Sequence, residues 1–244
     1  MTDAELYRRG SETLLASWQA YACGSVEARL LRAPGVAAAV FPAEPERSVY
    51  NNALLERDLA DGERAHALEK MEAAYTGAGV ARFAAWAHET DVRLCADLEA
   101  RGYRLDTTTR AMGMSLDRLN VSTPEIELGS LDWDEYLRVF ELPAGLLSRA
   151  DHTEFRVLVA RLDGEDAATA MAYDLDGDSG IYNVGTLERF RRRGLGTALT
   201  ALHLHRARER GCRTASLQAT EAAERMYARV GFRDLGRILE FVPG

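Results

Sequence analysis

The two halves of this chain resemble each other at matching points, and this internal repeat restricts the folds that the chain can adopt. Residues 49–57 read VYNNALLER, and residues 181–189 read IYNVGTLER. Further along, residues 98–103 (LEARGY) match residues 227–232 (YARVGF) at nearly the same distance from the first block. A repeat of this length indicates two copies of one supersecondary unit. Chance similarity between two α/β segments is the alternative, and the shared Tyr-Asn and Leu-Glu-Arg in register weigh against it.

Hydrophobic periodicity predicts alternating helices and strands in both halves. In the first half we expect helices at 3–22, 58–75 and 91–100, and strands at 36–41, 48–55, 80–87 and 108–116. In the second half we expect helices at 133–142, 194–210 and 221–230, and strands at 157–162, 167–175, 179–187, 214–219 and 235–242. Asp163-Gly164 and Asp176-Gly177 predict hairpin turns. The pattern predicts an α/β (α+β) protein with domains at 1–118 and 125–244, joined by a linker at 119–124.

Composition argues against several classes of protein. Apolar residues make up 47% of the 244 residues and charged residues 28%, as in globular chains and unlike disordered ones. The net charge of −8 argues against nonspecific nucleic-acid binding and mildly favours a cationic acceptor. Cys23, Cys95 and Cys212 lie far apart in the sequence, so we expect reduced thiols and no metal site. The acidic N-terminus and the lack of a long apolar run predict a cytoplasmic protein without a membrane span.

The segment Arg191 to Gly196 is the sharpest local feature, because it reads RRRGLG between a predicted strand and a predicted helix. Glycines let the backbone approach a ligand closely, and a helix N-terminus offers free N–H groups and a positive dipole end. Arginine side chains pair with phosphate oxygens. These features together predict a pyrophosphate site. A solvated arginine run before an ordinary helix is the alternative.

Two better-known phosphate-binding motifs do not fit this loop. A dinucleotide-binding fingerprint needs a third glycine where Leu199 stands, and only two strands are predicted after the loop, too few for a doubly wound sheet. A Walker loop needs Gly-Lys-Ser/Thr, and the only lysine of the chain is Lys70. We therefore reject both motifs.

The second half resembles the GCN5-related N-acetyltransferase (GNAT) family. That family has Arg/Gln-x-x-Gly-x-Gly/Ala after its fourth strand, which Arg191 to Gly196 matches. Upstream it has a strand whose splayed end binds the pantetheine arm, here residues 182–187. Downstream it has Ala-x-x-x-Tyr on a helix and then a Gly-Phe turn, here Ala223 to Tyr227 and Gly231-Phe232. Thr220 departs from the Asn or Ser that is common there. The resemblance covers 125–244 and implies two GNAT-like halves, each a mixed, mostly antiparallel sheet flanked by helices.

The resemblance implies acetyl-CoA (coenzyme A) as the cofactor and an acyl-CoA-dependent N-acyltransferase. Such an enzyme moves an acetyl group to an amine of a small molecule, an amino-acid derivative or a protein terminus, by direct attack on the thioester. The implied cofactor-binding residues are Val184, Gly185, Thr186, Arg191, Arg192, Arg193, Gly194, Leu195, Gly196, Thr197, Thr220, Ala223 and Tyr227.

The resemblance also implies two catalytic groups. The backbone N–H of Val184 would stabilise charge on the carbonyl oxygen, and Tyr227 would protonate the leaving thiolate. Taken alone, Tyr227 would be an ordinary buried aromatic on an amphipathic helix. The general base stays open: its candidates are Asp151, His152, Glu154, Asp174 and Glu188, and a water relay is the alternative.

The first half lacks the features of the loop. Its corresponding residues 58–64 read DLADGER, in which Asp61 and Glu63 would repel a pyrophosphate and the paired glycines are missing. Leu98 stands where the second half has Tyr227. We therefore expect a degenerate GNAT-like half without a cofactor, whose role is to cover an edge of the active half and to wall the acceptor pocket.

The expected partner is a small-molecule or peptide amine, with no nucleic acid and no membrane, and the chain is expected to be a monomer or a homodimer. A non-catalytic acetyl-CoA sensor or regulatory module is the alternative function. A structural protein with a decayed site is a third, and the joint retention of the loop and Tyr227 argues against it.

Overall fold

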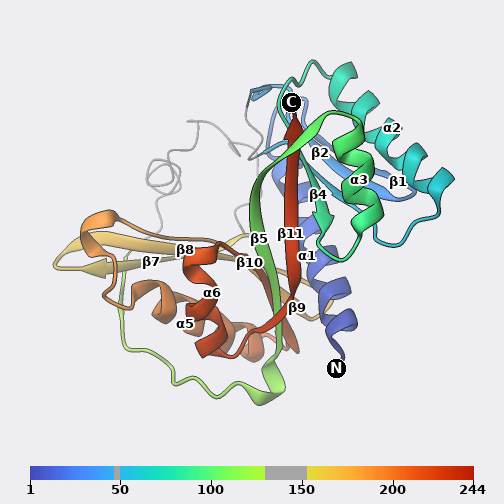
Figure 1. The fold of residues 1–244 in the computed structure, drawn as a ribbon. Coiled ribbons are helices and arrows are strands. Elements are labelled where there is room, and N and C mark those ends of the chain that lie inside the picture. Colours follow the sequence, from blue (N-terminus) through green and yellow to red (C-terminus); the bar gives the residue numbers. More distant parts are fainter. Residues whose placement is uncertain (47–49, 130–152) are drawn as a thin grey trace. The chain divides into compact units, whose positions relative to one another are not determined.

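The computed structural model describes residues 1–46, 50–129 and 153–244, and Figure 1 traces the chain through them. These residues form two compact units that interleave along the sequence. Unit 1 contains residues 1–17, 111–129 and 153–235, and unit 2 contains residues 18–46, 50–110 and 236–244. The N-terminal helix and the last strand therefore each divide between the units. The helix expected at 133–142 lies outside the described residues.

Unit 1 is built around a mixed sheet with the strand order β5-β10-β9-β8-β7-β6. Its strands are β5 (Tyr103–Ser115, from Ala111 onward), β6 (Glu127–Leu128), β7 (Arg156–Leu162), β8 (Glu165–Leu175), β9 (Asp178–Thr186) and β10 (Thr214–Ala219). Its helices are α1 (Asp3–Cys23, up to Ser17), α5 (Leu195–Glu209) and α6 (Glu221–Val230), with short 3-10 helices η1 (Leu116–Arg118) and η2 (Glu188–Phe190). Strands β6 to β9 pair antiparallel, whereas β9 and β10 pair parallel.

The hairpins of unit 1 follow from local sequence. Asp163 and Gly164 join β7 to β8, and Asp176 and Gly177 join β8 to β9. All four residues have positive φ angles, between 45° and 82°. Two consecutive positive φ values define the hairpin turn whose twist matches the flanking strands, and Asp-Gly tolerates them well. Both predicted hairpins are confirmed.

The two faces of the unit 1 sheet are covered by different helices. Apolar side chains of α5 and α6 pack against Ile181 of β9 and Leu217 of β10. Successive side chains of a strand point to opposite faces, so the neighbouring Ser216 points away from α5 and α6. On that other face lies α1, because a Cβ atom added at Gly10 would lie 2.7 Å from Cβ of Ser216.

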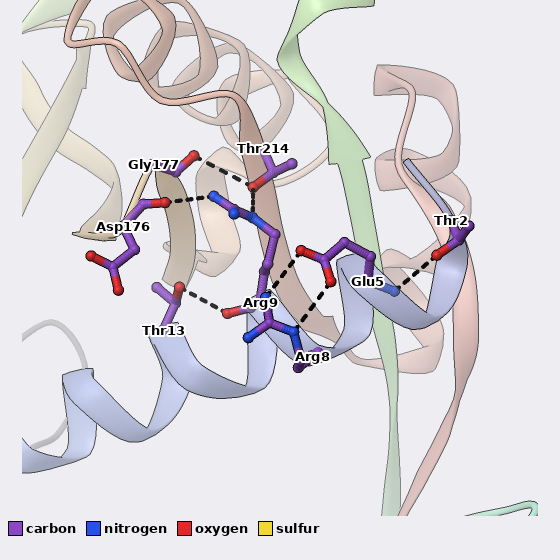
Figure 2. A network of polar contacts seen from close by, with 8 residues as sticks. All are labelled: Thr2, Glu5, Arg8, Arg9, Thr13, Asp176, Gly177 and Thr214. Atoms are coloured by element: carbon purple, nitrogen blue, oxygen red, sulfur yellow. Dashed lines mark hydrogen bonds and ion pairs between the residues drawn. The ribbon is translucent and has the colours of Figure 1, made fainter.

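Arg9 fixes α1 to the sheet of unit 1. Figure 2 shows its side chain reaching from the helix to β10 and to the β8–β9 turn. Its Nε donates to Oγ1 of Thr214 at 3.1 Å, and its Nη2 donates to the carbonyl oxygen of Asp176 at 2.6 Å. Hydrogen bonds from a charged donor are stronger than neutral ones. A helix from the start of the chain is therefore fixed to strands encoded near its end.

The close approach of α1 to β10 makes a prediction at Gly10. Alanine normally stabilises a helix relative to glycine by about 0.5–1 kcal/mol. At Gly10 we expect the opposite sign, a loss of about 1–3 kcal/mol, because the added methyl group would overlap Ser216. Gly77 at the end of a helix in unit 2 is the control, since nothing lies within 4 Å of a Cβ atom placed there. Urea unfolding measures both variants, and a stabilised Gly10→Ala would contradict the packing described here.

Unit 2 contains a mixed sheet segment with the strand order β1-β2-β3-β4-β11-β5. Its strands are β1 (Arg29–Ala33), β2 (Val36–Val40), β3 (Asn52–Leu55), β4 (Ala84–His88), the first part of β5 and the part of β11 (Arg233–Pro243) from Gly236 onward. Its helices are the end of α1, α2 (Asp61–Gly77) and α3 (Val92–Ala100). Strands β3 and β4 pair parallel, whereas β1 with β2, β2 with β3 and β4 with β11 pair antiparallel. The core centres on a stack of Tyr75 and Phe83, whose ring centroids are 4.0 Å apart.

The order of elements supports the predicted internal repeat. In unit 2, β3 pairs antiparallel with β2 and parallel with β4, and α2 follows β3 along the chain. In unit 1, β9 pairs antiparallel with β8 and parallel with β10, and α5 follows β9. The helices α3 and α6 come next in each case, and each leads into a long strand. The two matched sequence blocks fall on equivalent elements of this pattern.

The structure differs from the predicted elements at a few places. Strands β1 and β6 were not predicted, and β4 begins at Ala84 and not at Val80. The residues before β4 are held as a turn, because Val80 donates its N–H to the Tyr75 carbonyl and Ala81 donates to Pro45. The second of these bonds depends on a partner distant in sequence, which periodicity does not reveal.

Glu240 is a mostly buried carboxyl group of unit 2. Burial raises its pKa to about 7, although a hydrogen bond from Oγ1 of Thr109, at 3.2 Å, lowers it in part, and the charge of Asp106 raises it further. A carboxyl group that binds its proton more tightly in the folded state than in the unfolded state stabilises the fold at low pH. That contribution is lost as the pH rises from the ordinary pKa of 4.5 towards 7.

We therefore expect Glu240→Gln to be more stable than the wild type above pH 7, by up to about 3 kcal/mol, since one pKa unit corresponds to about 1.4 kcal/mol. Near pH 4.5 the two proteins should be equally stable, because Glu240 is then neutral in the folded protein. The exposed Glu69 of α2 provides the control Glu69→Gln, in which the same substitution is made at the protein surface. Urea unfolding at several pH values measures this, and a constant gap between wild type and variant would contradict it.

Candidate functional site

The parallel strands β9 and β10 separate soon after they begin. They pair at Asp178 with Thr214, at Ser179 with Ala215 and at Gly180 with Ser216. Beyond that point β9 continues to Thr186 and β10 to Ala219 without further pairing to each other. We call the last pair, Gly180 and Ser216, the vertex. Backbone groups beyond the vertex are available to an extended ligand that pairs with a strand edge.

A β-bulge lies on β9 within this open stretch. The register with β8 shifts, so that Met171 faces Tyr182 while Thr169 faces Gly185. Asn183, in the extra length of chain, has a positive φ of 50°. A bulge of this kind changes the direction of the backbone groups that follow it. Val184 comes directly after the bulged residue, and its side chain packs against the core clusters of unit 1.

The segment Arg191 to Gly196 leads into α5 without a side-chain cap. Gly194 is the N-cap residue in the left-handed conformation, with φ of 83°, and Arg192 also has a positive φ of 63°. The first intrahelical bond runs from the N–H of Ala198 to the carbonyl of Gly194. The N–H groups of the preceding turn therefore have no acceptor within the helix. They and the positive end of the helix dipole favour an anion at this point.

Gly196 faces Val184 and Thr186 of β9 and Met226 of α6. A Cβ atom placed there would lie 3.6 Å from Cγ1 of Val184, 3.8 Å from Sδ of Met226 and 4.0 Å from Oγ1 of Thr186. These are ordinary contact distances, so packing within the protein does not require a glycine. A longer side chain would instead compete for room with these residues of β9 and α6.

The three arginines before Gly194 are exposed at the end of β9. Arg191 donates from Nε to the carbonyl oxygen of Thr186, at 3.3 Å. Arg193 pairs with Asp163 at 3.2 Å across an exposed surface and lies 5.8 Å from the centre of the Phe190 ring. Exposed pairs of this kind are weak, so a phosphate can compete for the same guanidinium groups.

Helix α6 carries the remaining predicted residues. Thr220 is its N-cap residue and makes no side-chain capping bond, and Ala223 packs partly buried against the core. The Tyr227 ring is buried and packs edge-on against Phe232, with ring centroids 5.9 Å apart. Burial raises the pKa of Tyr227 to about 12. The phenol therefore keeps its proton throughout the neutral range and is available as a hydrogen-bond donor.

The candidates for the general base differ in burial and in hydrogen bonding. Burial alone would raise the pKa of Asp174, but hydrogen bonds from Arg210, Ser179 and Arg156 hold it below its ordinary value. Asp174 is thus a structural partner of arginines and a poor proton acceptor. Glu188 begins η2 directly after β9 and is exposed, as is Glu154. Asp151 and His152 lie outside the described residues.

The corresponding region of unit 2 is closed by its own residues. Strands β3 and β4 stay paired as far as Leu54 and Trp86, next to the end of β3. Oε2 of Glu63 accepts from the N–H of Ala60 at the start of α2, which occupies a donor that an anion would need.

Arg64 fills the adjoining space in unit 2. Its side chain is buried, with Nε donating to Asp97 at 2.6 Å and Nη1 donating to the carbonyl oxygen of Leu59. The strand divergence and the bulge of unit 1 therefore have no equivalent in this part of unit 2. The N-cap residue of α2, Ala60, also makes no side-chain capping bond, but the carboxylate of Glu63 stands at this helix start.

Three residues of unit 1 that contribute here were not identified from the sequence. Met226 lines the space at Gly196, and its place beside Tyr227 in the α6 motif was the available signal. Asp178 and Ser216 are buried and hydrogen-bonded to each other next to the vertex. Polar residues at the starts of two apolar strands could have drawn attention to them.

No helix in the described parts of the chain is long and apolar enough to cross a membrane. Over residues 1–46, 50–129 and 153–244, histidine, cysteine and acidic side chains form no group of three or more that could hold a metal ion.

We compared the sequence and the structure of this chain with those of known proteins. Residues 125–232 match the sequence model of the family described as Acetyltransferase (GNAT) family. None of the curated proteins matches this sequence.

Solved structures match nearly the whole chain. A GCN5-related N-acetyltransferase from Kribbella flavida is similar with a TM-score of 0.70 and 20% identity, over 96% of this chain and 95% of that one. A second from Sphaerobacter thermophilus gives 0.64 and 18%, over 95% and 84%. A tandem GNAT protein from the clavulanic acid biosynthesis pathway gives 0.60 and 16%, over 99% and 95%. At such identities the likeness is one of fold.

Proposed function

Residues 125–232 are an acetyltransferase domain of the GNAT family, and from this premise we propose that the chain is an acyl-CoA-dependent N-acyltransferase. It moves an acetyl group from acetyl-CoA to an amine of a small molecule, an amino-acid derivative or a protein terminus. The observation that carries the proposal is the separation of β9 from β10 beside the uncapped N-terminus of α5. An open strand edge that leads to an anion site suits a ligand with an amide-bearing arm and a pyrophosphate.

The residues that would hold coenzyme A follow from this arrangement. The N–H groups of Leu195, Gly196 and Thr197 and the guanidinium groups of Arg191 to Arg193 would bind the pyrophosphate. The edge of β9 at Val184, Gly185 and Thr186 would pair with the pantetheine arm. Gly196 leaves room for that arm, and Thr220 and Ala223 of α6 line its other side. When bound, the cofactor supplies an acyl group activated as a thioester.

Two groups of this chain would act on the reacting atoms. The backbone N–H of Val184 would donate to the acyl oxygen as negative charge grows there, and the bulge at Asn183 sets the direction of that N–H. Tyr227 would donate its phenolic proton towards the leaving sulfur. Its pKa of about 12 keeps the donor form available at neutral pH.

The amine acceptor must lose a proton before or during attack. Asp174 is held by arginines, so Glu188, Glu154 or a water relay takes this role among the described residues. Asp151 and His152 stay candidates. The net charge of −8 favours a cationic acceptor.

The start of α5 in unit 1 and the start of α2 in unit 2 differ in charge, and this difference supports one cofactor site in each chain. We propose that the N-terminal half is a degenerate GNAT-like copy, because the acidic start of α2 and the buried Arg64 occupy the space of a pyrophosphate. Calorimetric titration of acetyl-CoA into the full chain tests the proposal. We expect saturable binding near one equivalent. Binding near two equivalents would contradict the degenerate half, and no binding would contradict the proposed function.

A sensor that binds acetyl-CoA without turnover is the second candidate. The state of Asp174 favours this candidate. Its carboxylate is bound by Arg210, Ser179 and Arg156 and is therefore a poor general base for catalysis. A screen of amines with detection of the released thiol separates the two functions, because a sensor binds acetyl-CoA and releases none.

A further inference from the structure

Two fully enclosed oxygen atoms on β9 lack hydrogen-bond partners within the described residues. They are Oδ1 of Asp178 and Oη of Tyr182. The other carboxylate oxygen of Asp178 accepts a hydrogen bond from Oγ of Ser216, at 2.7 Å, and the residue is 1% exposed. Buried polar groups in folded proteins are almost always paired, since an unpaired one loses its hydration without compensation. Because both atoms belong to side chains of the same strand, we look for one explanation for the two.

The two oxygen atoms lie on the same face of β9. Asp178, Gly180 and Tyr182 alternate along the strand, and their side-chain positions therefore share one face. A Cβ atom placed on Gly180 would lie 2.1 Å from Oη of Tyr182, so the phenol folds back over this glycine towards Asp178. Burial raises the pKa of Tyr182 well above its ordinary value, and the charge of Asp178 raises it further. The phenol and the carboxylate are thus close enough to interact without being in direct contact.

A third polar group comes from α1. Ser17 is buried beside the Tyr182 phenol, and its hydroxyl donates to the carbonyl oxygen of Leu14 at 2.7 Å. The Ser17 oxygen therefore has lone pairs left but no hydrogen to give. It lies close enough to the phenol to lower the pKa of Tyr182 in part, although the pair does not have the geometry of a normal hydrogen bond. Three buried polar side chains, one from α1 and two from β9, therefore lie near one another.

We propose that one internal water molecule binds between Asp178, Tyr182 and Ser17, and that it makes Asp178 and Tyr182 positioning residues for the acyl-transfer site. The water donates one hydrogen to Oδ1 of Asp178 and one to Oγ of Ser17, and it accepts the hydrogen of the Tyr182 phenol. Every donor and acceptor is then used, as is usual for buried water. A metal or ammonium cation offers no acceptor, so the phenolic hydrogen would then depend on the poorly aligned Ser17 oxygen.

The proposed water lies near the proposed acyl-transfer site, and its positioning role rests on that proposed function. Gly180 and Ser216 are the vertex, Asp178 is bonded to Ser216, and Tyr182 directly precedes the bulged Asn183. The network therefore fixes the backbone at the point where β9 leaves β10. Since the N–H of Val184 lies just beyond, its direction depends on the same stretch of strand.

The experiment uses acetyl-CoA labelled with carbon-13 at the acetyl carbonyl, bound to the full chain and observed by NMR. Hydrogen bonds to a carbonyl oxygen polarise it and shift its resonance. For Tyr182→Phe and Asp178→Asn we expect the bound resonance to move back towards that of free acetyl-CoA. The affinity should stay within about threefold of wild type, a change below 1 kcal/mol. Ser179→Ala is the matched control, since it removes a buried hydroxyl from the opposite face of β9 and should leave the resonance unchanged.

A crystal structure at a resolution that shows ordered water gives the second readout. We expect one density peak between the three residues in the wild type and its loss or displacement in Tyr182→Phe. If Tyr182→Phe does not fold, Ser17→Ala removes the third partner with little change in volume. An empty site would overturn the water, and an unshifted resonance in the variants would overturn the positioning role. Failure of the wild type to bind acetyl-CoA would instead refute the proposed function, while the density would still decide the water site.

Discussion

Replacing Gly196 with glutamate is expected to weaken acetyl-CoA binding at least about 100-fold, equivalent to about 2.7 kcal/mol. The new side chain starts 3.6 Å from Val184 and 3.8 Å from Met226, in the space between β9 and α6. It also brings a negative charge to the N-terminal turn of α5, where the pyrophosphate is proposed to bind. Both effects act against the ligand, since like charges brought together in a site cost several kcal/mol. Calorimetric titration measures the affinity.

The first half of the chain supplies the matched control, at the start of α2. Gly62 lies in the first turn of α2, at the start of the equivalent helix, and a Cβ atom there meets nothing within 4 Å. We expect Gly62→Glu to bind acetyl-CoA as the wild type does, because that helix start is already occupied by Glu63. Gly196→Ala should lie between the two, with a loss of a few fold. Equal loss in Gly62→Glu and Gly196→Glu would refute the assignment of the site to unit 1.

The second large effect is expected for Tyr227→Phe, with a fall in kcat of about 100-fold, at the lower end of what general acid catalysis contributes. The phenylalanine keeps the ring that packs edge-on against Phe232, so the fold should be unaffected. Only the hydroxyl is lost, and with it the proposed donor to the leaving sulfur. Steady-state kinetics with the best amine of the screen measures kcat and KM separately.

The affinity for acetyl-CoA distinguishes the possible roles of Tyr227. We expect it to stay within about threefold of wild type, since the cofactor is held mainly at β9 and α5. A large loss of affinity with unchanged kcat would make Tyr227 a binding residue and not a proton donor. Unchanged kcat and affinity would leave the buried ring as a core aromatic, the alternative that the sequence also allowed.

Local sequence was sufficient for much of unit 1. Helices α5 and α6 and strand β10 lie at or within one residue of their predicted bounds, because their apolar periodicity and flanking glycines act within a few residues. The hairpins at Asp163 and Asp176 followed from Asp-Gly turns in the same way. The segment Arg191 to Gly196 was also recognisable, since its function as a helix start depends on adjacent residues alone.

Other features depend on contacts between distant residues and could not be predicted. The vertex at Gly180 and Ser216 exists only once two strands far apart in sequence are paired. The bulge at Asn183 is a mismatch with β8, although an asparagine, which tolerates a positive φ, was a local hint. The place of α1 on the sheet rests on Gly10 and Arg9, whose partners follow about two hundred residues later. Periodicity along one segment carries no information about such partners.

The pairing of Arg9 with Thr214 spans 205 residues and sets the order in which the chain can mature during its synthesis. The ribosome makes α1 long before the strands that receive it, so the apolar face of this helix waits until those strands have emerged. Residues 236–244, which complete unit 2, are made after the rest of both units. Neither unit can close until its own last segment has emerged, although domains usually fold one after another as they are made. Nascent chains of this protein should therefore depend on chaperones that shield an early amphipathic helix, and truncation of a few C-terminal residues should affect the half encoded first.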